Sequence, residues 1–461
     1  MKYILPPYND FLYLLQLEEY NSKRYLKLIP RFFFRRDLQQ RDNLRNTLRI
    51  KVTRIILQFQ TLAILILLGW GIIQLNNHII QSTLTATLFV LILFIVPYQV
   101  LITNILIDPL LKILKEKSEQ KAKELIKNRP DIKIIAITGS FGKTTTKNIL
   151  YQLVRNKYKT QATPGNINTS IGIANWLQKE LQPSTQLLII EMDAYEIGEI
   201  KQACLITPPD IAVITNFGDQ HLEKLGGHHQ LMDANLEIIL NARNNAVLII
   251  PKDEYNKARK SLRVEELLKN VKVCFTENSN NLSYKNQALT TNLTDHTAII
   301  NMQLALKVAE LLDIPKEIIS HVSKHIQIPE RRGDIKLIND FTVIDKSYNI
   351  SEATARASVI EAHNSAARQG KDLIVVTAGI PERGQESFRV NKEYGHFLKN
   401  YSKYIILLQS IYAPAIEVGI SNKFITKKAN RMDKALEMAK SLGSPAKTLI
   451  LMQPELTDLS Y

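Results

Sequence analysis

A glycine-rich segment with a lysine and three threonines lies at residues 139–146, where it reads Gly-Ser-Phe-Gly-Lys-Thr-Thr-Thr. It follows an apolar stretch at 133–138 that predicts a buried strand, and a helix is expected after it. The backbone N–H groups of such a loop can surround phosphate oxygens, and the positive end of the helix adds to the attraction. Lys143 can neutralise the β- and γ-phosphates of a nucleotide, and the Thr144 hydroxyl can bind Mg²⁺. The predicted nucleotide-binding residues of this loop are Gly139, Ser140, Gly142, Lys143, Thr144 and Thr145.

Two more polar side chains follow predicted strands. The strand predicted at 187–190 ends in Glu191, and the strand predicted at 211–215 leads into a loop that contains His221. In an open α/β sheet, ligands gather at the carboxyl ends of strands, where a carboxylate can bind Mg²⁺ directly or through water. Taken singly, Glu191 could be a surface glutamate and His221 a solvated loop histidine. Their order after a phosphate loop favours a nucleotide site.

Eight segments between about 130 and 400 resemble the Mur ligase family, the ATP-dependent amide ligases of peptidoglycan precursor synthesis and their relatives. The GEI, SYN and ERGQES-like segments are most similar to the branch of UDP-N-acetylmuramoyl-tripeptide–D-alanyl-D-alanine ligases. The segments are ITGSFGKTTTK at 137–147, TPGNINTSIG at 163–172, EMDAYEIGEI at 191–200, DIAVITNFGDQHLEKLGG at 210–227, NMQLALKVAELLDI at 301–314, IPERR at 328–332, VIDKSYNIS at 343–351 and AGIPERGQES at 378–387.

The resemblance implies an α/β fold with two catalytic domains. A P-loop central ATPase domain is expected at 130–326 and a Rossmann-like C-terminal domain at 327–461, with ATP and Mg²⁺ as cofactors. The implied catalytic residues are Lys143, Glu191 and His221, and the implied metal ligands are Thr144, Glu191 and His221.

Further roles carry over from the family's motifs. Asn301 matches a nucleotide-side asparagine, and Arg331 or Arg332 matches an arginine that reaches the ATP phosphates near the domain junction. The start of the closing domain would place three more residues near the nucleotide, and Asn166 matches the substrate-side loop. These three residues are Asp345, Tyr348 and Asn349.

The sequence departs from the family pattern at several places. Asn235 stands where the family usually has a lysine that is carbamylated to bridge metals, and Lys346 stands where an acidic residue is common. The phosphate loop is one residue shorter than G-x-x-x-x-G-K-[ST], unless Thr138 fills the first glycine's place. The C-terminus lacks the expected Lys-Gly-Ser-Arg-like element. A membrane hairpin is expected where the family has its sugar-nucleotide domain.

That hairpin is predicted at 52–107, because no Asp, Glu, Lys or Arg occurs between Arg54 and Asp108. The stretches 55–75 and 84–107 are each long enough to cross a hydrocarbon core of about 30 Å. Lysines and arginines flank both outer ends, and the connecting turn has no fixed charge. The positive-inside rule therefore predicts two spans of the cell membrane, with both termini and the catalytic domains in the cytoplasm. The alternative is a buried helical hairpin in a soluble core.

The remaining segments are a basic, amphipathic cytoplasmic lead-in at 1–50 and a charged linker helix at 108–129. The lead-in could be an interfacial anchor or a small helix packed on the rest of the chain. Basic residues near the membrane account for much of the net charge of +15, and no nucleic-acid-binding module is recognisable. The two distant cysteines, Cys204 and Cys274, indicate buried thiols rather than a disulfide framework.

These features predict a membrane-anchored ATP-dependent amide ligase. It would activate a carboxylate as an acyl phosphate and join it to an amino acid or dipeptide. The expected partners are a carboxylate-bearing precursor such as a UDP-muramyl peptide, the amine substrate and the lipid bilayer. One alternative is a related ligase that acts on another amino-acid or polyglutamyl substrate. Another is a degenerate nucleotide-binding scaffold at the membrane.

Overall fold

The computed structural model describes most of the chain, and it separates into two compact units, Met1–Lys117 and Ser118–Leu456. The described residues are 8–18, 20–33, 44, 46–74, 78–165, 167–218, 225, 227–259, 264, 268–269, 271–277, 279, 281–293, 295–328, 334–346, 350–381, 383, 386–420 and 426–453.

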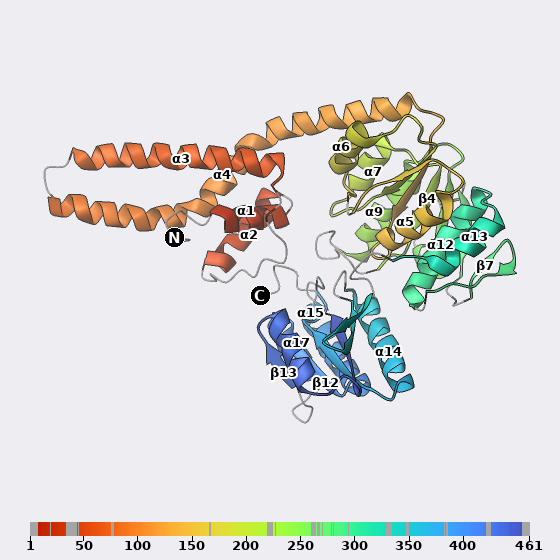
Figure 1. The fold of residues 1–461 in the computed structure, drawn as a ribbon. Coiled ribbons are helices and arrows are strands. Elements are labelled where there is room, and N and C mark those ends of the chain that lie inside the picture. Colours follow the sequence, from red (N-terminus) through yellow and green to blue (C-terminus); the bar gives the residue numbers. More distant parts are fainter. Residues whose placement is uncertain are drawn as a thin grey trace. The chain divides into compact units, whose positions relative to one another are not determined.

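The first unit is helical (Figure 1). The side chain of Thr47 accepts a hydrogen bond from the Ile50 N–H and so caps the N-terminus of the third helix. Leucines and aromatic residues of the first two helices pack against the base of the two long ones and form a small core of their own. The elements are α1 (Tyr8–Leu17), α2 (Ser22–Phe33), α3 (Leu48–Ile73) and α4 (His78–Lys127).

Helix α4 is longer than the sequence pattern indicated. The second apolar stretch and the charged segment that follows it form one continuous helix, although Pro97 and Pro109 lie inside it. Each proline removes one backbone hydrogen bond, but the residues on either side remain good helix formers. The charged segment predicted as a helix is thus helical up to Lys127 and continuous with the second apolar stretch.

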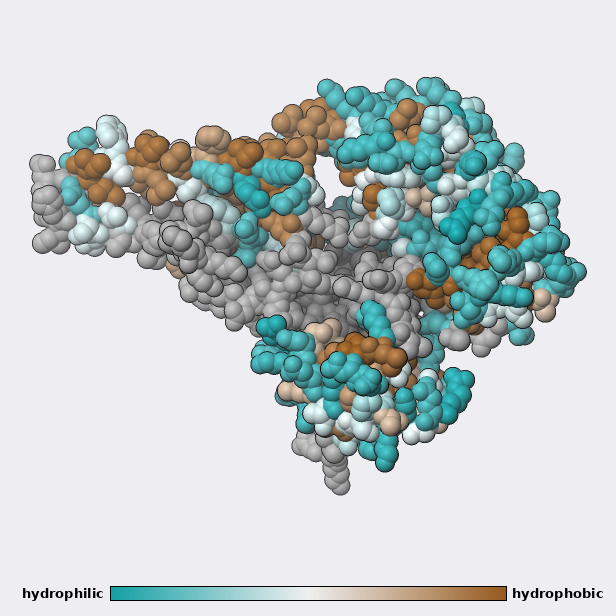
Figure 2. Space-filling model, viewed as in Figure 1, coloured by the Kyte–Doolittle hydropathy of each residue, from teal (hydrophilic) through white to brown (hydrophobic). Residues whose placement is uncertain are grey.

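Apolar side chains on α3 and α4 face outward, as the hydrophobic band along this hairpin shows (Figure 2). Phe59, Ile66 and Trp70 are among them, each more than 60% exposed. Within the described residues, Leu48–Ile73 and Phe94–Lys127 are long and apolar enough to cross a membrane by length and composition. Only 6% of the most apolar stretch of α3 is buried, whereas the core helix of a soluble protein is mostly buried.

The second unit begins with a parallel six-stranded sheet in the order β2-β3-β1-β4-β5-β6. Its four inner strands are short runs rich in Ile, Leu and Val, which suit a sheet buried on both faces. The elements are β1 (Lys133–Thr138), α5 (Lys143–Val154), β2 (Thr160–Ala162), α6 (Ser170–Glu180), β3 (Leu187–Glu191), α7 (Glu199–Ile206), β4 (Ile211–Ile214), α9 (His228–Leu240), β5 (Val247–Pro251), α10 (Lys252–Ala258) and β6 (Lys272–Thr276).

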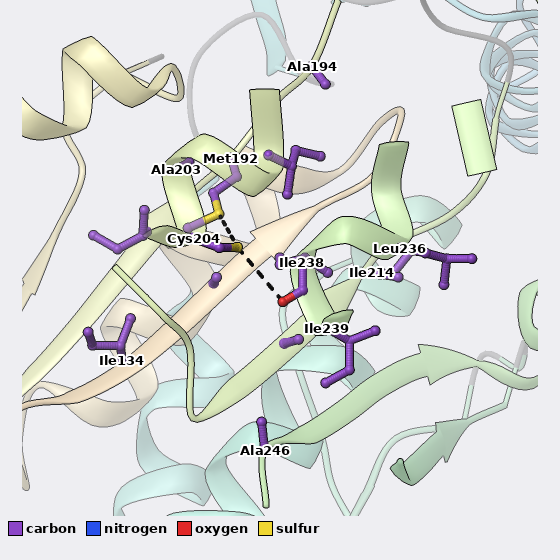
Figure 3. Packing of buried hydrophobic residues seen from close by; sticks show 14 of the residues in the cluster. Ile134, Met192, Ala194, Ala203, Cys204, Ile214, Leu236, Ile238, Ile239 and Ala246 are labelled. Carbon is purple, nitrogen blue, oxygen red and sulfur yellow. Dashed lines mark hydrogen bonds between the residues drawn. The ribbon is translucent and has the colours of Figure 1, made fainter. Parts of the chain in front are cut away.

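Helices cover both faces of this sheet (Figure 1). Helices α6, α7 and α9 contribute to one core, where the Cys204 thiol lies 3.7 Å from the Met192 sulfur (Figure 3). Helices α5 and α12 contribute to the other core. The chain then adds β7 (Ser283–Tyr284), β8 (Gln287–Ala288), α12 (His296–Leu311), α13 (Lys316–Val322) and the 3₁₀ helix η1 (Ser323–His325).

A second six-stranded sheet follows in the order β13-β12-β11-β14-β10-β9, and only its edge strand β9 is antiparallel. Helices α14, α15 and α16 pack on one face and α17 on the other. The elements are β9 (Asp334–Ile338), β10 (Phe341–Asp345), α14 (Glu352–Arg368), β11 (Asp372–Thr377), α15 (Ser387–Tyr401), β12 (Tyr404–Leu408), α16 (Ala413–Ile420), β13 (Thr426–Ala429), α17 (Met432–Ser441) and β14 (Thr448–Gln453). The predicted fold class, two α/β sheets in sequence, is confirmed.

Candidate functional site

The glycine loop connects β1 to α5, and two of its glycines occupy positions where no other residue fits. Gly139 has a φ of +131°, and a Cβ there would lie 2.1 Å from the Thr215 hydroxyl. Gly142 has a φ of +85°, and a Cβ there would lie 2.4 Å from Oδ1 of Asn301. Both residues combine a left-handed backbone with a close neighbour, so only glycine allows this path of the loop.

The residues that follow β4 fix the shape of this loop. The Thr215 hydroxyl and the Asn216 side-chain amide both donate to the carbonyl of Phe141, at 2.6 and 2.7 Å. Ser140 donates to the carbonyl of Gly218 at 3.0 Å. The Ser140 N–H donates to the Asn216 carbonyl at 3.2 Å, and the Phe141 N–H donates to the Asn216 side-chain oxygen at 3.3 Å. An anion would therefore bind where the loop ends, at the N-terminus of α5, as phosphates do at helix N-termini.

Lys143 is buried at the first position of α5, with a side chain that is 5% exposed. Its ammonium donates to the carbonyls of Gly139 and Ser140, at 2.5 and 3.2 Å, and lies 3.2 Å from a carboxylate oxygen of Asp193. The lysine is thus held at the loop that it follows, with one negative partner. It is placed to compensate the charge of phosphates bound by that loop.

Glu191, at the end of β3, lies beside the same helix. The Thr144 hydroxyl donates to one of its carboxylate oxygens at 3.0 Å, and the ammonium of Lys147 lies 2.8 Å from the other. The side chains of Glu191 and Lys147 are each only 2% exposed. A hydroxyl and carboxylates are the hard oxygen donors that Mg²⁺ prefers, so Thr144 and Glu191, with Asp193 nearby, fit a magnesium ion.

Asn235, which the resemblance places at the position of a family lysine, makes two side-chain hydrogen bonds. The carbonyl oxygen of Asn235 accepts from the Thr138 hydroxyl at 3.0 Å, and its amide donates to the Leu231 carbonyl at 2.8 Å. The nearby Glu237 accepts the backbone N–H groups of Gly198 and Lys201 at the start of α7. Burial raises the pKa of Glu237, and these two N–H groups oppose that rise. Its carboxylate therefore serves as a helix cap.

A pocket opens on the other side of the glycine loop. Phe141, Gly142, Thr145 and Asn301 line it from the first sheet's domain, and residues of the second sheet's domain, including Gln453, complete it. Lys346 also lines this pocket, and its ammonium is paired with Asp295 and, at 3.5 Å, with Glu361. Burial lowers the pKa of Lys346, while Glu361 opposes that change. The positive charge of Lys346 is thus balanced by two carboxylates.

The structure brings most of the described site residues together. Lys143 and Thr144 follow the glycine loop, the Thr144 hydroxyl bonds to Glu191, and the Asn301 side chain contacts Gly142 in the wall of the pocket. Asp345 ends β10 and lies 3.5 Å from the ammonium of Lys336. The other predicted site residues lie outside the described residues: Asn166, His221, Arg331, Arg332, Tyr348 and Asn349. Among the described residues, no group of three or more His, Cys, Asp or Glu side chains could hold a metal ion.

Two residues of this site were not predicted, Lys147 and Asp193. Each had a local signal. Lys147 follows Lys143 by four positions and so lies on the same face of α5, one turn on. Asp193 follows Glu191 by two positions at the exit of β3. Neither signal says which charge each side chain would meet, because their partners come from other parts of the chain.

Comparison with known proteins agrees with this geometry. Residues 137–312 match the Mur ligase middle domain. The UDP-N-acetylmuramoyl-tripeptide–D-alanyl-D-alanine ligase of Bacillus subtilis is 34% identical over 150 residues, which is 32% of this chain and 32% of that protein. The enzyme of the same name from Buchnera aphidicola subsp. Baizongia pistaciae is 27% identical over 65% of this chain and 67% of its own length.

The solved structures agree on the fold. The MurF ligase from Thermotoga maritima, in complex with ADP, superposes with a TM-score of 0.62 at 23% identity and covers 74% of this chain and 80% of its own. The match to the B. subtilis protein spans about a third of that relative's length. Residues 137–312 match the Mur ligase middle domain, and through this segment the chain is similar to the Mur ligases.

Proposed function

We propose that the chain is an ATP-dependent amide ligase of peptidoglycan precursor synthesis. The observation that carries this proposal is the glycine loop at the carboxyl edge of a parallel sheet, followed by Lys143 and Thr144. The Thr144 hydroxyl lies 3.0 Å from a carboxylate oxygen of Glu191. This arrangement binds the phosphates of a nucleotide beside a hard-oxygen metal site. The relatives' names supply the reaction class.

In the proposed reaction, the γ-phosphoryl group of ATP passes to a substrate carboxylate and forms an acyl phosphate. An amine then attacks the acyl carbon, and phosphate leaves as the amide forms. Lys143 and the N–H groups at the start of α5 would hold the phosphates and stabilise the charge that develops on them. A magnesium ion held by Thr144 and Glu191 would supply further neutralisation. The protein contributes mainly orientation and compensating charge.

The proposed substrates follow from the relatives' names. They are a carboxylate-bearing UDP-N-acetylmuramoyl tripeptide and the dipeptide D-alanyl-D-alanine. We assign residues 130–326 and 327–461 to the central and C-terminal domains of such a ligase. Within them, His221 would support the metal site, Asn166 the substrate loop, and Arg331 or Arg332 the phosphates. Asn301, Asp345, Tyr348 and Asn349 would lie on the nucleotide side.

We also propose that α3 and α4 anchor the enzyme in the cell membrane. The support is the outward apolar surface of both helices and the basic residues at their outer ends. Both termini and the catalytic domains would then be cytoplasmic. A bilayer partner would cover the apolar side chains that both helices expose.

The decisive experiment uses the full chain in detergent or nanodiscs. It is incubated with ATP, Mg²⁺, UDP-N-acetylmuramoyl tripeptide and D-alanyl-D-alanine. Phosphate release that requires both substrates, with the ligated product detected by mass, is expected. Phosphate release that is independent of any acceptor, or no turnover although ATP binds, would contradict the ligase proposal.

A further inference from the structure

A buried lysine pairs with the metal-site carboxylate and has no place in the reaction described above. Lys147 lies on the second turn of α5, and its ammonium lies 2.8 Å from Oε2 of Glu191. Both side chains are 2% exposed, so water screens the pair very little. Burying a lysine ammonium costs free energy unless it is paired with an opposite charge, so the folded structure depends on this contact to hold Lys147 inside the protein.

The same ammonium also binds the loop that follows β2. Lys147 donates to the carbonyl of Gly165 at 2.8 Å. Two residues earlier in that loop, the Thr163 hydroxyl accepts the backbone N–H of Glu191 at 3.1 Å. The loop that leads to Asn166 is therefore fastened at two points to Glu191 and its partner.

The charges around the phosphate loop balance in pairs. Lys143 is paired with Asp193, and Lys147 is paired with Glu191. Glu191 divides its two oxygens between the Thr144 hydroxyl and the Lys147 ammonium. A divalent cation that binds Glu191 must therefore share it with a fixed positive charge, which weakens the attraction of the site for that cation.

We infer that Lys147 is a positioning residue. Its fixed ammonium orients Glu191 towards Thr144, lowers the affinity of the site for divalent cations, and connects the metal site to the loop at 163–169. This inference rests on the proposed function, because it takes Glu191 as a metal-site residue. It adds that one side chain joins the metal site to the acceptor-side loop.

The test is Lys147→Met, which keeps the length of the side chain and removes its charge. Mn²⁺ is titrated into the full-length protein with a non-hydrolysable ATP analogue, and free Mn²⁺ is measured by electron paramagnetic resonance. The variant should bind Mn²⁺ about tenfold more tightly, because Glu191 no longer faces a competing cation at short range. At saturating Mg²⁺ its KM for the tripeptide substrate should rise, since the 163–169 loop loses the hydrogen bond from Lys147 to the Gly165 carbonyl.

Three further variants make the result interpretable. Lys147→Gln removes the charge but keeps a hydrogen-bond donor, so it serves if Lys147→Met does not fold. Lys147→Met with Glu191→Gln removes both charges and should lose the gain in Mn²⁺ affinity. Lys179→Met, at an exposed lysine of α6, should behave as the wild type. Unchanged or weaker Mn²⁺ binding in both single variants at Lys147 would overturn the inference. A wild-type protein that binds no nucleotide would instead overturn the proposed function.

Discussion

The backbone of Gly142 and the side chain of Asn301 are in close contact. A Cβ on Gly142 would lie 2.4 Å from Oδ1 of Asn301, and Gly142 itself has a φ of +85°. The asparagine, from the first half of α12, thus closes the phosphate loop on the side of the pocket. Loop conformation and pocket shape depend on each other at this contact.

Gly142→Ala should therefore lose nucleotide binding while the sheet remains folded. The added methyl group must displace Asn301, and the left-handed backbone is strained for alanine, so we expect ADP affinity to fall by about tenfold or more. Isothermal titration calorimetry measures the affinity, and circular dichroism checks the fold. Gly370→Ala is the matched control, because Gly370 also has a positive φ, +63°, but no atom within 4 Å of its Cβ position. Equal ADP affinity in the two variants would show that the Asn301 contact has no role.

Lys143→Ala should abolish ATP-dependent ligation. The ammonium is bound to the loop carbonyls and to Asp193, and no other lysine of the described residues donates to those carbonyls. We expect phosphate release to fall to the level without enzyme, measured by a coupled phosphate assay. Lys143→Met controls for lost volume and should be equally inactive. Turnover at the wild-type rate in either variant would remove the assignment of this loop to ATP.

Local sequence patterns were sufficient to predict the phosphate loop and the strand that ends in Glu191. The glycines, lysine and threonines of a phosphate-binding loop lie close together in the sequence, so the loop can be found from sequence alone. Strands that are buried on both faces appear in the sequence as short apolar runs. The pairing of Lys147 with Glu191 could not be predicted in the same way. The two residues come from different elements, and only the order of strands β3 and β1 in the sheet brings them together. The length of α4 was underestimated because a change of composition at Asp108 resembled a boundary.

Cys204 and Cys274 should differ sharply in reactivity. Burial and the nearby Glu237 carboxylate raise the pKa of Cys204 to about 12, so little thiolate forms at pH 8. Cys274 is partly exposed on β6. In the native protein, a thiol reagent should modify Cys274 quickly, and it should modify Cys204 only after denaturation. Cys274→Ser should remove the fast phase, which mass spectrometry of the labelled peptides can verify. Fast labelling of Cys204 in folded protein would contradict the packing around it.

The hairpin of α3 and α4 should place its connecting turn outside the cell. A single cysteine at Asn77, in a background without the two native cysteines, should react with a membrane-impermeant maleimide in intact cells. A cysteine at the exposed Lys179 of the catalytic unit should react only after lysis. The basic flanks predict this orientation, and labelling of position 179 but not of position 77 in intact cells would require the opposite topology.

Asn235 should make the metal site independent of bicarbonate. Its amide nitrogen is not a basic amine and cannot form a carbamate, and both its polar groups are already bonded, to Thr138 and to the Leu231 carbonyl. The site therefore has one negative charge fewer than a site with a carbamylated lysine. We expect turnover to need a higher Mg²⁺ concentration than an enzyme with a carbamylated lysine would need, and to be unaffected by added bicarbonate. The measurement is the ligase rate as a function of Mg²⁺ concentration and of bicarbonate concentration.

Asn235→Lys tests the same point from the other direction. If the lysine becomes carbamylated, the variant should gain a dependence on bicarbonate and reach half-maximal rate at lower Mg²⁺. Glu237→Gln is the companion variant, because Glu237 caps α7 through Gly198 and Lys201 and should affect stability more than metal dependence. The variant should be less stable because the neutral glutamine oxygen accepts weaker hydrogen bonds from those N–H groups than the glutamate carboxylate does. Strong activation of the wild type by bicarbonate would mean that another lysine carries the carbamate, and that Asn235 does not correspond to the family lysine.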